Sequence, residues 1–194
     1  RTFKEIQGLS PSEYRKYGYQ PVIISTDELI MKFTNRLRGG IFLNPNIIKR
    51  DSIIIAGTHG DGSETGGVWQ AFEKLSNEKP LKNALSKNGY EIRAYDGNKC
   101  TVYVGHCVSS KDVDSDYSVF ELPSSKYASF DVYVANGYGS ENNAMEEWLE
   151  TNETGYSERL LNGNFHYCVE YYDERFNGSE TNSIVEIWIP IEKL

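Results

Sequence analysis

Alternation of hydrophobic and polar positions predicts two β-strands at the C-terminal end of the chain. In the run 184–191, one side carries only valine and isoleucine, whereas the other side carries Glu186 and Trp188. The preceding run 166–172 alternates in a similar way. Because side chains point to opposite faces along a strand, each run has one face suited to a core and one that carries an acid among aromatic rings.

From Asp51 onward, the predicted elements occur twice in the same order. The first set is a strand at 52–57, a glycine-rich loop, a helix at 68–75, and strands at 90–95 and 100–108 joined by Asp96-Gly97, a strong hairpin signal. The second set is a strand at 126–135, a helix at 141–151 and the two C-terminal strands. The pattern predicts an α+β fold in which two pseudo-repeated strand-helix-strand-strand units form an antiparallel-rich sheet. Helices pack on this sheet, and a central ligand groove is expected where the halves meet.

Charge and composition narrow the possible functions. The net charge of −8 is concentrated after residue 20, because the first segment is net positive. An acidic surface repels phosphate backbones, so residues 21–194 are not expected to bind nucleic acid themselves. No apolar run approaches the ~18 residues of a membrane span, and no secretory leader is visible. We therefore expect a cytoplasmic protein with no membrane partner.

Metal and cofactor chemistry finds no support in the sequence. His59, His106 and His166 have no metal-ligand spacing. The three cysteines are odd in number and suit neither a disulfide framework nor a zinc knuckle. The glycines between Gly57 and Gly67 lack the lysine of a phosphate-binding loop, so a turn is the simpler interpretation. No cofactor, no metal and no catalytic residue is predicted.

The candidate site combines carboxylates with aromatic rings, which together suit an organic cation. The predicted ligand-binding residues are Glu170, Glu186, Trp188, Tyr172, Tyr103, Tyr133, Trp69 and Trp148. The tyrosines fall on strand faces opposite the apolar sets, as the glutamates do. Two simpler alternatives stay open: the helix tryptophans pack in the core, or a glutamate pairs at the rim with Arg159 or Arg175.

Two parts of the chain resemble known families. Residues 3–15 carry the pattern F-x-x-x-x-G-x-S-P-x-x-Y-R and resemble the closing segment of an AraC-type helix-turn-helix domain. The chain from about Asp51 resembles a GyrI-like effector-binding domain. The matching pieces are Val68–Phe72, Thr101–Gly105, Leu122–Phe130 and Val185–Ile191.

The resemblance implies a division into three parts: a helix-turn-helix remnant at 1–18, a connecting segment at 19–50 and an effector-binding domain at 51–194. It implies the ligand-sensing domain of a transcription regulator, as in multidrug-responsive regulators, with a small lipophilic cation as its effector. DNA would be a partner only through the missing part of the helix-turn-helix domain. The sequence leaves the identity of the effector and the oligomeric state open.

Two other functions fit the same residues. A tyrosine beside a glutamate could hydrolyse reactive electrophilic toxins by acid–base chemistry. Alternatively, the acidic groove could be a protein-interaction module that captures a basic partner. Turnover of an activated substrate would favour the hydrolase, whereas stoichiometric binding without product would favour the sensor.

Overall fold

A computed structural model describes residues 45–134, 139–150, 154–180 and 182–194. These residues belong to a unit that spans Asn35–Leu194. The expected helix-turn-helix remnant at 1–18 and most of the connecting segment lie outside the described residues. Within the described part, no helix is long and apolar enough to cross a lipid bilayer.

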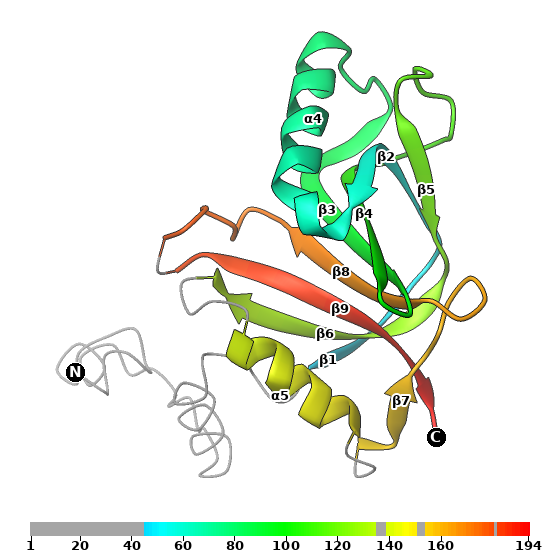
Figure 1. The fold of residues 1–194 in the computed structure, drawn as a ribbon, viewed down its shortest axis with the longest axis vertical. Helices are drawn as coiled ribbons and strands as arrows, with labels where there is room; N and C mark the ends of the chain where they lie inside the picture. The colour runs from blue at the N-terminus through cyan, green and yellow to red at the C-terminus, as the bar shows by residue number, and fades with distance from the viewer. Residues whose placement is uncertain (1–44, 135–138, 151–153, 181) are drawn as a thin grey trace, which may run out of the picture. The chain divides into compact units, whose positions relative to one another are not determined.

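One nine-stranded sheet and two α-helices make up the described fold (Figure 1). The strands are β1 (Asn46–Arg50), β2 (Ile53–Asp61), β3 (Ala84–Asp96), β4 (Lys99–Val108), β5 (Ser118–Leu122), β6 (Ser125–Tyr133), β7 (Tyr156–Glu158), β8 (His166–Tyr172) and β9 (Ile184–Lys193). The helices are α4 (Thr65–Glu78), preceded by the 3-10 turn η1 (Gly62–Glu64), and α5 (Gly139–Glu150). Every strand pair is antiparallel, which confirms the predicted α+β class.

The strand order shows the predicted duplication. Along the sheet the order is β1-β6-β9-β8-β3-β4-β2-β5, with β7 beside β9. The central six strands therefore mirror each other: β2-β4-β3 from the first half meets β8-β9-β6 from the second. The two halves join where β3 pairs with β8, and we call this pair the seam. Gly97 closes the predicted hairpin of β3 and β4 with a φ of 55°, which glycine adopts at little cost.

The glycine-rich segment differs from the prediction, because most of it is regular structure. Strand β2 continues to Asp61 and α4 already begins at Thr65. Gly57 pairs directly with Gly105 on β4, and a Cβ added at Gly57 would overlap the Val104 carbonyl oxygen. The missing side chains let the two strands approach closely, so here glycine extends the pairing of β2 with β4.

Three short strands were not predicted. Strand β1 lies in the expected connecting segment and pairs with β6, so the sheet begins at Asn46 and not at Asp51. Strand β5 pairs with β2, and β7 pairs with the end of β9. Each is an edge or peripheral strand whose partner is distant in sequence, and local alternation does not reveal such pairing.

Hydrophobic residues cover both faces of the sheet, and both described α-helices pack on the same face. Val68 and Phe72 of α4 pack on β4, and Ala144 and Met145 of α5 pack on β6 and β9. The opposite face holds a cluster that includes the fully buried Ile92, Tyr127, Val169 and Trp188. On the helix-bearing face, the seam between the two helix-covered clusters carries polar residues instead.

Candidate functional site

Two buried glutamates face each other across the seam. Glu91 on β3 is the register partner of Glu170 on β8, and their exposed fractions are only 3% and 9%. Arg93, two residues further along β3, places Nη2 2.6 Å from Glu91 Oε1 and Nε 3.5 Å from Glu170 Oε1. The centre of the helix-bearing face therefore holds two carboxylates and one guanidinium.

Aromatic side chains complete this cluster. The Tyr172 hydroxyl donates a hydrogen bond of 2.8 Å to Glu170 Oε2. From α4, Trp69 Nε1 donates a hydrogen bond of 2.7 Å to Glu91 Oε2. The Trp69 and Tyr172 rings meet edge to face with their centroids 5.5 Å apart. Helix α4 is thus tied directly to the acidic pair.

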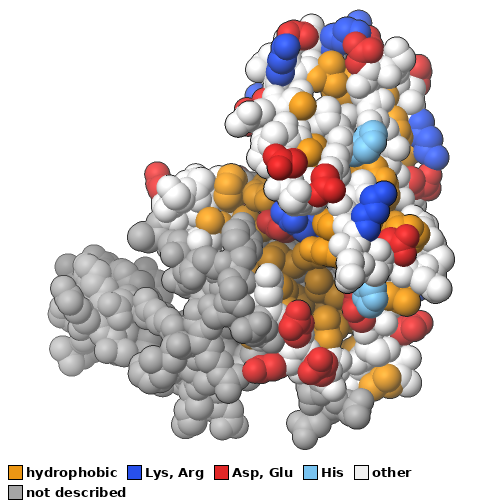
Figure 2. Space-filling model, viewed as in Figure 1, with side chains coloured by type: hydrophobic (Ala, Val, Ile, Leu, Met, Phe, Trp, Pro, Cys, Tyr) orange, Lys and Arg blue, Asp and Glu red, His pale blue; other side chains and the backbone are white. Residues whose placement is uncertain are grey.

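The cluster opens into a cavity of about 400 Å³, within the size range of small-molecule sites. The lining residues are Glu91, Arg93, Tyr95, Asn142, Cys168, Glu170, Tyr172 and Ile187. Asn142 comes from α5, and the other residues come from strands β3, β8 and β9. Figure 2 shows basic, acidic and hydrophobic side chains together in the hollow between the part that carries α4 and the part that carries α5.

Burial decides the protonation of the cavity's acid. Burial raises the pKa of Glu170, and the charge of Glu91 raises it further, against the opposing effects of Tyr172 and Arg93. The pKa of Arg93 stays above its usual value: burial lowers it, but the charges of Glu91 and Glu170 outweigh burial. Glu170 therefore keeps its proton to a higher pH than an exposed glutamate does, beside a charged guanidinium.

The structure brings three of the eight predicted residues to this cluster. Glu170 and Tyr172 line the cavity, and Trp69 reaches it through Glu91. The prediction that both glutamates line one groove is wrong. On β9, Ile187 is the register partner of Glu170, whereas Glu186 is the partner of Tyr171, so the two acids lie on opposite faces of the sheet.

Glu186 and Trp188 lie on the face of the sheet opposite the cavity, where Trp188 is part of the hydrophobic cluster. Arg175 Nη2 lies 3.0 Å from Glu186 Oε2, which matches the simpler alternative of an ion pair with that arginine. Trp188 is 1% exposed and donates from Nε1 to Glu186 Oε1 at 2.9 Å. The Arg50 guanidinium lies 4.5 Å from the centroid of the Trp188 ring. This arrangement leaves Trp188 no access to a ligand from the helix-bearing face.

The other three predicted residues also lie away from the cavity. Tyr103 and Tyr133 are partly buried on the Trp188 face, where Tyr103 packs against Phe120 with a centroid distance of 4.5 Å. Trp148 of α5 packs edge to face on Phe130 at 5.8 Å, as the core-packing alternative expected.

Sequence reasoning missed Glu91, Arg93 and Asn142. The internal repeat contained a signal for the first of these, because β3 and β8 are equivalent strands of the two units. In both strands one glutamate stands between hydrophobic or aromatic neighbours: Tyr90-Glu91-Ile92 in β3 and Val169-Glu170-Tyr171 in β8. The position of Asn142 depends on how α5 packs, which the repeat does not specify.

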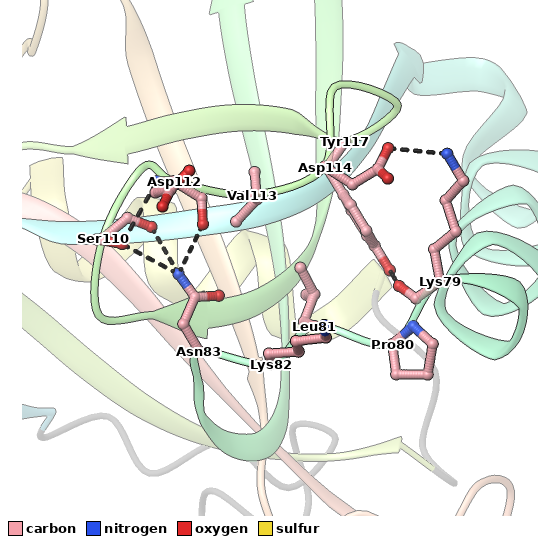
Figure 3. A pocket seen from close by; sticks show the side chains of 10 residues that line it. All are labelled: Lys79, Pro80, Leu81, Lys82, Asn83, Ser110, Asp112, Val113, Asp114 and Tyr117. Atoms are coloured by element: carbon pink, nitrogen blue, oxygen red, sulfur yellow. Dashed lines mark hydrogen bonds and ion pairs between the residues drawn. The ribbon is translucent and has the colours of Figure 1, made fainter.

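A second cavity, of about 670 Å³, lies at the end of α4 (Figure 3). Lys79, which lines it, is already paired, since its Nζ lies 2.9 Å from Asp114 Oδ1 and 2.7 Å from Asp116 Oδ2. The Tyr117 hydroxyl donates to the Lys79 carbonyl oxygen at 2.6 Å. These contacts close the loop onto the helix, so we regard the seam cavity as the candidate site.

Several solved structures share this fold. The structure of SAV2435 bound to tetraphenylphosphonium is 18% identical, with a TM-score of 0.55, and the match covers 76% of this chain and 93% of that one. The EcmrR C-terminal domain is 15% identical, with a TM-score of 0.54 and coverages of 77% and 97%. EcmrR in a complex with DNA is 14% identical, with a TM-score of 0.61 and coverages of 100% and 69%.

Sequence comparison identifies the family. No curated protein sequence matches the chain. A family of effector binding proteins matches residues 46–191, which include both described helices and every described strand except the last two residues of β9. The resemblance to GyrI-like effector-binding domains is thereby confirmed. The chain belongs to the Cass2 family of integron-associated effector binding proteins.

Proposed function

We propose that this domain binds a small lipophilic cation in the seam cavity and acts as the ligand-sensing part of a transcription regulator. The observation that carries the proposal is the buried carboxyl of Glu170, which lines a cavity and faces a second buried acid, Glu91. The one guanidinium of Arg93 lies near both acids, and it is closer to Glu91 than to Glu170, so an ionised Glu170 lacks a close positive partner of its own, which is costly in a buried place. A ligand cation would supply that partner.

The aromatic side chains strengthen this recognition. Tyr172 and Tyr95 line the cavity, so a cationic ligand can meet ring faces as well as Glu170. Attraction between opposite charges is stronger in a water-poor cavity than at the protein surface. A bound cation would lower the pKa of Glu170, because its positive charge opposes the effect of burial.

The relatives support the same function. One protein with this fold was solved with tetraphenylphosphonium, a lipophilic cation, and another was solved with DNA. We propose that DNA is contacted through a helix-turn-helix domain of which residues 1–18 are the final segment. Residues 19–45 would then connect it to the sensing domain.

Sensing requires that the ligand favour one arrangement of the protein over another. The cavity is suited to this role because α5 contributes Asn142 to its wall, and α4 contacts its acids through Trp69. A ligand in the cavity would therefore contact groups that set the positions of both helices. We propose that a change in the helices is passed to the DNA-binding part.

Isothermal titration with tetraphenylphosphonium tests the cation site. Glu170→Gln should weaken binding at least about tenfold, equivalent to ~1.4 kcal/mol, because it removes the charge and keeps the side-chain shape. Glu186→Gln is the matched control, since Glu186 lies on the opposite face, and it should change the affinity little. If Glu186→Gln weakens binding and Glu170→Gln does not, the ligand binds on the other face.

Binding should also depend on pH in a defined direction. Since the pKa of Glu170 is raised, the cation must displace a proton at pH values below that pKa. We expect affinity to increase as pH rises from the usual glutamate pKa through the raised value, and then to level off. Titration in buffers of different ionisation enthalpy should reveal proton release in that window. An affinity that stays constant across it would argue against Glu170.

Hydrolysis is the second candidate function for this cavity. Burial raises the pKa of Cys168, so its thiol is a poor nucleophile. The Tyr172 hydroxyl donates to Glu170, and this is the tyrosine–glutamate pair that the hydrolase requires. Product formation from an activated ester, lost in Glu170→Gln, would favour the hydrolase instead.

A further inference from the structure

We propose that the cavity selects ligands that carry a hydrogen-bond acceptor, such as a carboxylate, beside their cationic group, and that Arg93 is the residue that determines this selectivity. The proposal rests on the cation site at Glu170. It concerns what else a ligand must contain to occupy that site.

Arg93 is the one basic residue among those that line the cavity in the described part of the chain. Its guanidinium is held in place from several sides. Nη2 lies 2.6 Å from Glu91 Oε1 and donates to Thr65 Oγ1 at 3.1 Å, while Nη1 donates to the Gly62 carbonyl oxygen at 3.4 Å. These partners lie on β3 and at the start of α4, so the guanidinium is anchored independently of Glu170.

The contact between Arg93 and Glu170 is the weak one of the cluster. Its N–O distance is 3.5 Å, against 2.6 Å for Arg93 and Glu91. We infer that Glu91 is the structural partner of Arg93, and that Glu170 is the acid that exchanges partners when a ligand enters. A ligand cation that binds Glu170 thus takes a position next to a fixed positive charge.

A simple lipophilic cation meets a penalty at this position. Two positive charges a few ångströms apart repel each other strongly where little water screens them. A ligand that also carries an acceptor removes the penalty, because the acceptor takes charge-assisted hydrogen bonds from the guanidinium. The cationic group and the acceptor must be close together, since Arg93 and Glu170 are themselves adjacent.

Two fluorescent dyes provide a matched test on the full 194-residue chain. Tetramethylrhodamine and its methyl ester share one cationic ring system, and differ in that the first has a carboxylate where the second has an ester. The native protein should bind the acid about tenfold more tightly than the ester, the size of one charge-assisted hydrogen bond. Fluorescence anisotropy measures both affinities.

Two variants assign the preference to Arg93. The double variant Glu91→Gln with Arg93→Leu removes both members of the ion pair, which avoids leaving one buried charge unpaired. This variant should no longer prefer the acid over the ester. Arg93→Lys keeps the charge but loses the forked geometry, and should reduce the preference. Thermal unfolding checks that each variant is folded. If the double variant does not fold, Arg93→Lys alone tests whether Arg93 determines the preference.

The outcomes separate this inference from the function on which it rests. If the native protein binds the ester as tightly as the acid, and both depend on Glu170, the cation site stands and the role of Arg93 is overturned. If the preference for the acid persists in Arg93→Lys and in the double variant, Arg93 is likewise excluded. If Glu170→Gln affects neither dye, the cation site itself fails, and this inference with it.

Discussion

At the scale of single residues, the proposed role of Glu170 in binding conflicts with the stability of the fold. Its carboxyl is buried beside Glu91, and both burial and that neighbour raise its pKa. Ionised Glu170 would therefore oppose folding while it attracts a cation. Residues that bind a ligand are often suboptimal for stability. Experiments can measure the effect of Glu170 on stability separately from its effect on binding.

Glu170→Gln should make the protein more stable at neutral pH. With a raised native pKa, the native state holds more protons than the unfolded state, so the free energy of unfolding falls as pH rises through the window between the two pKa values. Glutamine cannot ionise and avoids this loss. The advantage of the variant should vanish when pH falls below the usual glutamate pKa.

Urea denaturation over a series of pH values measures this difference. Glu121→Gln is a suitable control, because Glu121 is a surface residue paired with Lys111 and such pairs contribute little to stability. A Glu170→Gln variant that is less stable than the native protein at neutral pH would show that the ionised carboxylate supports the fold.

The residue scale also shows how far sequence reasoning could go. Acid and aromatic residues in alternation led to Glu170 and Tyr172, and the same pattern led to Glu186 and Trp188 on the wrong face. Alternation separates the two faces of one strand, but it does not say which face of the next strand lies beside it. Strand register decides that question. The register partner of Glu170 is Ile187, and Glu186, one residue before it, therefore lies on the opposite face.

At the scale of elements, the long helices and hairpins were predictable, whereas the extent of β2 was not. Glycine usually weakens a strand, so the sequence after Gly57 was expected to be a loop. The structure uses Gly57 and Gly105 as a cross-strand pair without side chains. The conformational preference of Gly57 gives no information about Gly105, its pairing partner on β4, which is distant in the sequence.

Two glycine substitutions test this account. Gly57→Ala should destabilise the protein by about 1–3 kcal/mol or more, because the new Cβ would overlap the backbone of β4. Gly67→Ala should instead stabilise it by about 0.5–1 kcal/mol, because Gly67 lies in α4 with nothing within 4 Å of an added Cβ. Chemical denaturation measures both. Equal tolerance of the two changes would contradict the close approach of β2 and β4.

At the scale of the whole described fold, the two halves share one hydrophobic cluster. On the face opposite the helices, Ile92 from the first half contacts the same cluster as Val169 and Trp188 from the second. Halves that share a sheet and a core are expected to unfold together. The duplicated order of elements was readable from the sequence, but this shared cluster was not, because it depends on the seam.

Ile92→Ala tests the coupling of the halves. Ile92 is 0% exposed at the seam, so its truncation should cost about 2–5 kcal/mol. Leu85→Ala on the same strand is the control, since Leu85 is 65% exposed and should change stability by less than about 0.5 kcal/mol. Circular dichroism and tryptophan fluorescence should report one common transition in each variant. Two separate transitions would mean that the halves fold independently.

The approximate symmetry of the seam affects the orientation in which a ligand can bind there. Glu91 and Glu170 occupy equivalent places in the two halves, but two residues further along the chain one half has Arg93 and the other has Tyr172. If the two sides of the cavity were identical, a ligand could bind in two opposite orientations with the same binding energy. Because the two sides differ, the two orientations would differ in energy, and a ligand at the proposed site would favour one of them.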